Sequence, residues 1–76
     1  MARQLDGQGR PYITLAQFLK LSNAAHHGGA AKSLVREGGV AVNGAPEDRP
    51  GRKLHPGDLV EHAGKKLTVA DEHVNG

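Results

Sequence analysis

Two basic side chains, Lys32 and Arg36, lie four residues apart in a stretch that reads GGAAKSLVREGGVAVNG, residues 28 to 44. On an α-helix this spacing puts them one turn apart on the same side. Leu34 and Val35 fall within about 60° of Ala31 around the same helix, so these three residues form an apolar stripe beside the cations. One face of this helix can therefore pack on a core while the neighbouring face presents two positive charges to an anionic partner.

The aromatic content limits how a nucleic acid could be bound. The chain has one Tyr, one Phe and no Trp, and we expect Phe18 to lie in the core. Proteins that bind single strands stack bases on several exposed aromatic rings, which this chain cannot supply. A binding surface here would instead contact phosphates, 2′-hydroxyls and the shape of a folded RNA. The cations that we expect to make such contacts are Lys20, Lys32, Arg36, Arg52 and Lys53.

The charges are unevenly distributed, although the formal net charge is only +2. Residues 1 to 36 carry five Lys or Arg and one acid, residues 37 to 48 carry three acids and no Lys or Arg, and residues 49 to 66 carry five Lys or Arg and two acids. Two basic segments could converge on one basic face, which would suit a polyanion. Charge alone leaves open the alternative of an ordinary solvated surface.

Five histidines raise the question of a metal site, but their spacing does not favour one. His26 and His27 are adjacent, and no pair has the i, i+4 spacing with a third ligand that zinc sites usually show. The chain has no cysteine, which excludes thiolate ligands and a disulfide framework. We therefore expect no metal and no other cofactor. A phosphate contact for His26 or His27 at the start of a helix is the interpretation we favour.

Catalysis is also disfavoured. The hydroxyl groups that could serve as nucleophiles have ordinary structural explanations, such as a helix cap for Thr14 and a helix surface for Ser33. The carboxylates lie in turns and near the end of the chain, where no apolar surroundings would shift their pKa values. The glycine pairs do not form a phosphate-binding loop or a dinucleotide signature. We therefore expect no enzyme activity and no catalytic residues.

The elements that would position the two cations can be predicted from local signals. Thr14 and Gln17 fit a capping box at the start of a helix over residues 15 to 21. A second helix is expected over residues 30 to 37, with Gly38 as its stop. A strand over residues 40 to 42 then leads into an Asn-Gly turn, which is a strong hairpin signal.

Three further strands are expected over residues 51 to 54, 59 to 62 and 66 to 70, separated by polar turns. At 76 residues the chain is one domain. The predicted fold class is α+β, with two short helices packed on a small antiparallel sheet over residues 13 to 70. Residues 1 to 12 are expected to form a flexible arm, and residues 71 to 76 a flexible tail.

The expected compartment rests only on absences. No apolar run approaches the ~20 residues that span a membrane, and the start of the chain does not have the pattern of a signal peptide. We therefore expect a cytoplasmic protein with no membrane partner. We also expect a monomer that binds no small-molecule substrate.

Two segments, ITLAQFLKLSNAAHHGGAAKSLVREGGVAVNG and RPGRKLHPGDLVE, together carry a family resemblance. The combination of A-K-x-L-V-x-x-G-x-V-x-V-N-G with a later R-K-L-x-P-G-D resembles the small RNA-binding domain first recognised in the ribosomal small-subunit protein S4, and above all its free-standing bacterial forms. The similarity covers residues 13 to 62.

The resemblance implies two helices packed on a small sheet, and a helix-plus-loop surface that docks structured RNA, often ribosomal or transfer RNA. The positions that match this surface are His26, His27, Gly28, Gly29, Lys32, Ser33 and Arg36. Many relatives carry a basic residue where this chain has Gly39, and Ser or Arg where it has His26 and His27, so this chain has less fixed positive charge at the surface. The free-standing form has no attached catalytic domain.

Two functions remain after these exclusions. The first is a non-catalytic RNA-binding protein that recognises structured ribosomal or transfer RNA, or a ribosomal particle, by backbone and shape in ribosome assembly or translation. The second is a small adaptor that uses the same surface to bind an acidic protein partner. A stable complex that persists in nuclease-treated lysate would favour the adaptor.

Overall fold

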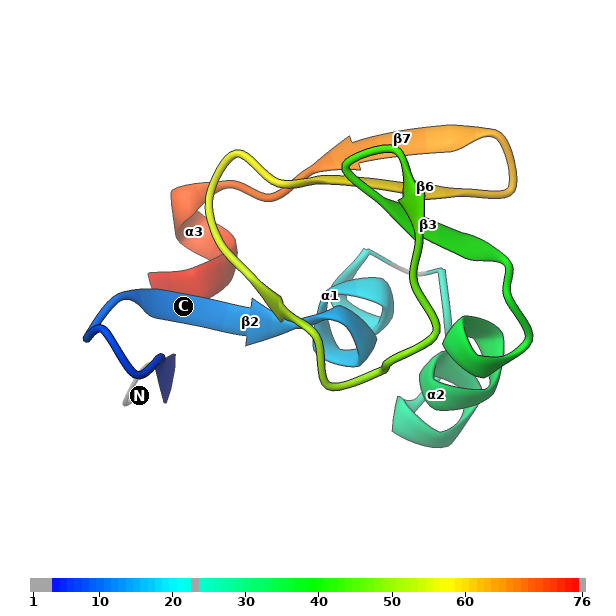
Figure 1. Ribbon diagram of the computed structural model, residues 1–76. Helices are drawn as coiled ribbons and strands as arrows, with labels where there is room; N and C mark the ends of the chain where they lie inside the picture. The colour runs from blue at the N-terminus through cyan, green and yellow to red at the C-terminus, as the bar shows by residue number, and fades with distance from the viewer. Residues whose placement is uncertain (1–3, 23, 76) are drawn as a thin grey trace.

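The computed structural model describes residues 4–22 and 24–75 (Figure 1). It contains three helices and two small sheets in these residues. The first sheet has the strand order β1-β2-β5 and the second has the order β4-β3-β6-β7, and every strand pair is antiparallel. This arrangement confirms the predicted α+β class. In chain order the elements are β1 (Gln4–Leu5), β2 (Pro11–Thr14), α1 (Leu15–Leu21), α2 (Gly28–Arg36), β3 (Val40–Val42), β4 (Ala45–Pro46), β5 (Lys53–Leu54), β6 (Leu59–His62), β7 (Lys65–Thr68) and α3 (Asp71–Asn75).

Helix α1 has the predicted bounds and the predicted capping box. The Thr14 hydroxyl accepts a hydrogen bond from the Gln17 N–H at 3.2 Å, and the Gln17 side chain accepts one from the Thr14 N–H at 3.0 Å. These bonds satisfy two of the backbone donors that every helix start leaves without a partner. Two more donors, the N–H groups of Leu15 and Ala16, bond to backbone carbonyls of the loop at residues 50–52. The start of α1 is thereby joined to that loop.

Helix α2 begins two residues before the predicted start and ends one residue before the predicted end. Its N-cap is His27, whose Nδ1 accepts a hydrogen bond from the Ala30 N–H at 3.2 Å. The predicted range missed this cap because Ser, Thr, Asp and Asn are the usual N-cap residues. Gly38 has a φ of +85°, which confirms it as the residue that ends the helix.

The predicted turns form where expected. Asn43 and Gly44 both have positive φ, which suits the two-residue hairpin between β3 and β4. The turn from His55 to Asp58 closes with a backbone hydrogen bond of 3.0 Å. The strand predicted over residues 51 to 54 is shorter, because its first half forms a turn. The last strand starts one residue earlier than predicted and ends at Thr68.

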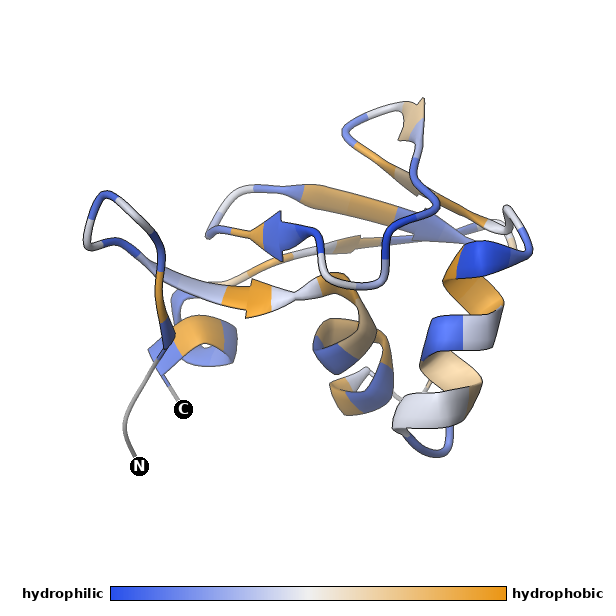
Figure 2. Ribbon diagram, turned by 60° about the horizontal axis from the view of Figure 1, so that its bottom comes forward, coloured by the Kyte–Doolittle hydropathy of each residue, from blue (hydrophilic) through white to orange (hydrophobic). Residues whose placement is uncertain are grey.

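The core lies between the helices and the sheets. Helices α1 and α2 lie on one side of the four-stranded sheet (Figure 1), and hydrophobic and hydrophilic residues occupy different sides of these helices (Figure 2). Phe18, Leu15 and Leu19 of α1 are at most 1% exposed. They belong to one cluster of buried side chains with Val35 of α2 and the inward-facing valines of β3 and β6. The predicted apolar stripe of α2 is thus confirmed.

The described part of the predicted N-terminal arm has regular structure instead. Strands β1 and β2 pair with Gln4 opposite Tyr12, and the Asp6 carboxylate accepts the N–H groups of Gln8 and Arg10 in the turn between them. The expectation of a loose segment is therefore wrong from residue 4 onward. It failed because strands of two residues are too short to show an alternating pattern. Residues 1–3 lie outside the described residues.

The predicted C-terminal tail is also corrected. Residues 71 to 75 form helix α3, in which Val74 is only 5% exposed. The His73 ring makes an edge-on contact with Phe18 at a centroid distance of 5.0 Å, and its Nδ1 accepts the Ala70 N–H. One apolar residue gives no helical period, so the sequence pattern could not reveal this packing. Residue 76 lies outside the described residues. No described helix is long and apolar enough to cross a membrane.

Candidate nucleic-acid interface

The outer face of α2 carries three of the predicted contact residues. Lys32, Ser33 and Arg36 are all exposed, whereas Ala31 and Val35 on the other side of the helix are fully buried. The helix therefore separates its charged side from its packed side, as the spacing predicted. Arg36 also lies in the last turn, where the partial negative charge of the helix end favours a cation.

His26 and His27, directly before α2, are exposed, but one backbone donor at the start of the helix already has a partner. Because His27 Nδ1 already accepts the Ala30 N–H, that donor is not free for a phosphate. A Cβ on Gly29 would lie 3.3 Å from two atoms of the His27 ring, so a glycine at this position leaves the ring room to cap the helix. His27 is thus a structural cap here. His26 is exposed beside it and remains a candidate contact.

The loop between β4 and β5 contains a charged cluster that the sequence pattern did not reveal. Glu47 is only 6% exposed. Its carboxylate accepts hydrogen bonds from the Arg49 side chain at 3.0 and 3.3 Å and from the Arg52 side chain at 3.0 Å. These hydrogen bonds lower the pKa of Glu47 to about 2. The bonds from Arg49 have the largest effect, and the bond from Arg52 comes second.

Glu47 and Arg49 were missed as members of the site. Glu47 is one of two adjacent acids in the polar segment from residue 46 to 50 and reads as an ordinary loop residue. The signal that could have found it is an acid followed by arginines two and five residues later, with a Pro-Gly turn between the arginines.

The other predicted cations lie on α1, on the loop before β5 and on β5 itself. Lys20 is exposed in the last turn of α1. The Lys53 ammonium lies over the Tyr12 ring, 5.4 Å from its centroid, which is within range of a cation–π interaction. Arg52 and Lys53 line a shallow hollow of about 410 Å³ together with Arg49 and Gly51. The structure therefore brings Arg52 and Lys53 together with a third cation, Arg49.

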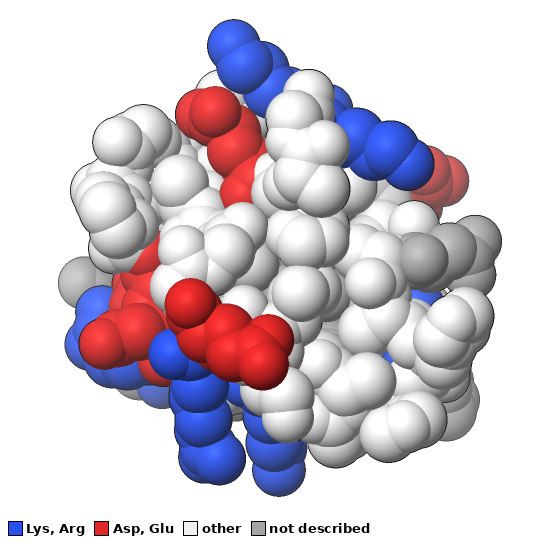
Figure 3. Space-filling model, turned by 90° about the vertical axis from the view of Figure 1, so that its right-hand side faces the viewer, with Lys and Arg blue, Asp and Glu red and all other residues white. Residues whose placement is uncertain are grey.

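The basic segments do not merge into one uniform face. Figure 3 shows one group of Lys and Arg side chains along the lower edge of the molecule and another along the upper edge, acidic side chains beside both groups, and mostly uncharged surface between them. Lys65 and Lys66 belong to β7, whose turn with β6 lies at the top of Figure 1, whereas α2 lies at the bottom. The two lysines of β7 are thus separated from the α2 face.

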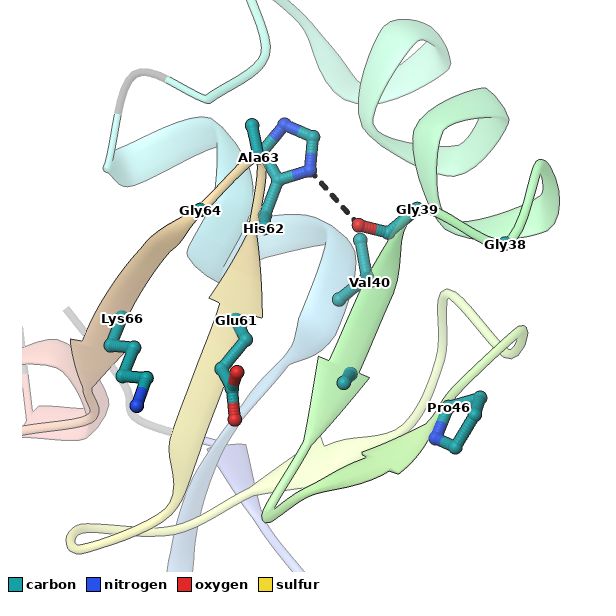
Figure 4. A pocket seen from close by; sticks show the side chains of 10 residues that line it. Gly38, Gly39, Val40, Pro46, Glu61, His62, Ala63, Gly64 and Lys66 are labelled. Carbon is teal, nitrogen blue, oxygen red and sulfur yellow. Dashed lines mark hydrogen bonds between the residues drawn. The ribbon is translucent and has the colours of Figure 1, made fainter.

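A groove of about 360 Å³ lies over the four-stranded sheet and the turn before β3 (Figure 4). Its lining includes Glu61 and Lys66, which are cross-strand partners, and the glycines at residues 38, 39 and 64. His62 Nδ1 lies 3.2 Å from the Gly39 carbonyl oxygen at one end. Because one acid and one base partly offset each other here, the groove carries no strong charge for a polyanion.

A separate side-chain contact joins the N-terminal hairpin to the turn after β5. His55 Nε2 lies 2.6 Å from the Asp6 carboxylate, which is largely buried. The Arg10 N–H, the Gln8 N–H and His55 together lower the pKa of Asp6 to about 2. Among the described residues, no three His, Cys, Asp or Glu side chains gather in a way that could hold a metal ion.

Comparisons with known proteins agree on one family. The model of the family described as "S4 domain" matches residues 7–70. "Probable ribosome maturation protein RlbA" of Bacillus subtilis (strain 168) is 52% identical over 52 residues, which cover 68% of this chain and 73% of that protein. "Putative RNA-binding protein YbcJ" of Escherichia coli (strain K12) is 37% identical over 59 residues, which cover 78% of this chain and 84% of that protein. The chain therefore belongs to the S4 domain family.

Proposed function

We propose that this protein is a non-catalytic RNA-binding protein that acts on ribosomal RNA during ribosome maturation. Membership of the S4 domain family supports RNA binding, and the relatives from Bacillus subtilis and Escherichia coli are named for ribosome maturation and RNA binding. The single observation that carries the proposal for this chain is the outer face of α2. There Lys32 and Arg36 stand exposed one turn apart on a helix whose other side is anchored in the core.

The proposed mode of recognition is contact with the RNA backbone and with the shape of a folded region. Phe18 is 1% exposed, and Tyr12 is half-buried with Lys53 over its ring. Neither ring can serve as an open stacking platform for bases. Cations on α2 and on the loop at residues 49–53 would instead neutralise phosphates. The full set of proposed contacts is Lys20, His26, Gly28, Gly29, Lys32, Ser33, Arg36, Arg52 and Lys53, with His27 acting through its cap on α2.

The test compares two double charge reversals. Lys32→Glu with Arg36→Glu reverses the α2 face, and Lys65→Glu with Lys66→Glu makes the same change in total charge on strand β7, outside the proposed contacts. Binding to a folded ribosomal RNA fragment is measured by fluorescence anisotropy over a salt series. The first variant should weaken binding much more than the second and reduce the log–log salt slope by about 1.5, which is the loss of two phosphate contacts. Equal effects of the two variants would refute the assigned surface.

A further inference from the structure

The turn at residues 49–52 brings two arginine side chains to one buried carboxylate. Arg49 and Arg52 are the first and fourth residues of this turn, which closes with a hydrogen bond of 3.1 Å from the Arg52 N–H to the Arg49 carbonyl oxygen. Pro50 occupies the second position, where its fixed φ favours a turn. Because the first and fourth residues of a β-turn lie close together, both guanidinium groups can reach Glu47.

Glu47 holds these two groups without using all of their donors. Each guanidinium has five N–H donors in a fixed plane. Glu47 accepts from two nitrogens of Arg49 and from one nitrogen of Arg52. The Glu47 side chain is 7% exposed, whereas that of Arg49 is 74% exposed. The carboxylate therefore lies on the protein side of the cluster, and donors of Arg49 remain on the solvent side.

The rest of the loop is anchored as well. The carbonyl oxygens of Pro50 and Arg52 accept hydrogen bonds from the start of α1, at 3.0 and 2.9 Å. Lys53 lies over the Tyr12 ring, and the next residue, Leu54, is fully buried. The hollow of about 410 Å³ that Arg49, Gly51, Arg52 and Lys53 line is ample for a phosphate group. It has one glycine in its wall, so a ligand can approach the backbone there.

We propose that this hollow is a preformed site for a single phosphate group, and that Glu47 is a positioning residue that holds two of its three cations. Arginine binds phosphate through paired donors in a fixed geometry. Holding the two arginines before the ligand arrives reduces the ordering that binding would otherwise require. The inference rests on the proposed function, because it takes the phosphate to be that of an RNA backbone.

The role of Glu47 can be separated from its charge. Glu47 and, to a smaller extent, Asp48 raise the pKa of Arg49, so both acids act electrostatically on the cluster. If only charge mattered, removing either acid would strengthen RNA binding. Asp48 is exposed. Among the described residues, we identify no role for it in holding Arg49 or Arg52. Asp48→Asn should therefore strengthen binding, whereas Glu47→Gln should weaken it roughly fivefold, although both remove one negative charge.

The experiment measures RNA affinity of the wild type, Glu47→Gln and Asp48→Asn at a temperature where circular dichroism shows all three folded. Affinity of Glu47→Gln equal to or higher than that of the wild type would overturn the proposal.

Should Glu47→Gln not fold, Arg49→Gln, Arg52→Gln and the double variant give a second test. Two cations on one phosphate should act as a unit, so the double variant should lower the salt slope by no more than about 0.9. A fall of about 1.6, with additive losses of affinity, would mean two separate phosphate contacts and would refute the single site.

A titration with inorganic phosphate distinguishes failure of this site from failure of the proposed function. Amide resonances of residues 51–53 should shift saturably with phosphate and stay in place with chloride at equal ionic strength. Saturable shifts in a protein that binds no RNA would support the site while refuting the RNA-binding function. RNA binding with no phosphate shifts and no effect of the arginine variants would refute the site and leave the function standing.

Discussion

The substitution Glu47→Gln tests how much the buried carboxylate contributes to stability. It keeps the size and shape of the side chain but replaces one accepting oxygen by an NH2 group that faces guanidinium donors. The pair with Arg52, which is 30% exposed, should contribute about 2 kcal/mol. The pair with Arg49, which is 74% exposed, should add little, because solvent screens it. The predicted loss in the free energy of unfolding is therefore about 2 kcal/mol.

The pKa of the group gives an upper bound on this loss. Lowering the pKa from its ordinary value of 4.5 to about 2 corresponds to at most about 3.4 kcal/mol. A domain of this length has a total stability of about 4 to 11 kcal/mol, so the effect should be large. At about 4 to 8 °C per kcal/mol, the melting temperature should fall by about 8 to 16 °C.

The pH dependence follows from the sign of the shift. The pKa of Glu47 is lower in the folded protein than in the unfolded chain, so its contribution is fully present above pH 4.5 and is lost as the pH falls toward 2. Urea denaturation followed by circular dichroism should therefore show a gap of about 2 kcal/mol between wild type and variant at pH 7, and a much smaller gap at pH 2.5. The control is Glu61→Gln, the same change on β6, which should cost less than about 0.5 kcal/mol. A Glu47→Gln variant as stable as this control, or a gap independent of pH, would refute the reasoning.

Three further predictions concern the caps and the two ends of the chain. His27→Ala should lose about 1 kcal/mol of stability in urea denaturation, because it removes the α2 cap, and His27→Asp should recover most of this loss. Equal stability of the wild type and the two variants would mean that the cap contributes nothing. Val74→Ala should cost about 1 to 2 kcal/mol and lower the melting temperature, whereas an unchanged melting temperature would show that α3 does not pack on the core. Asp6→Asn should destabilise the protein above pH 4, and the difference should shrink as the pH falls toward 2, since the pKa of Asp6 is lowered in the folded state. A difference as large at pH 2 as at pH 7 would contradict the contacts with Arg10 and His55.

Local rules predicted the parts of this fold whose signals lie within a few residues. The capping box of Thr14 and Gln17 set the first helix correctly, and the Asn43–Gly44 turn marked a hairpin. The bounds of α2 were less accurate, because a histidine cap followed by two glycines is not a common helix start. These successes and errors both follow from how strongly the nearby side chains determine the backbone.

The features that depend on distant contacts could not be predicted in this way. Strand β1 is held by its pairing with β2, and α3 by the burial of Val74 and the contact of His73 with Phe18. Glu47 looks like a solvated acid until the turn brings two arginines to it. At the candidate interface, the amphipathic character of α2 could be predicted from spacing. The cap made by His27 and the cluster around Glu47 required the folded structure.

The most direct test of the account is binding of the wild-type protein to a folded ribosomal RNA fragment and to a single strand of matched length and composition, over a salt series. Recognition by backbone and shape predicts tighter binding to the folded RNA, with a negative log–log slope in which each phosphate contact adds about 0.7 to 0.9. Equal or tighter binding to the single strand would contradict recognition of folded shape. Absence of binding to either RNA at low salt would contradict the RNA-binding function itself.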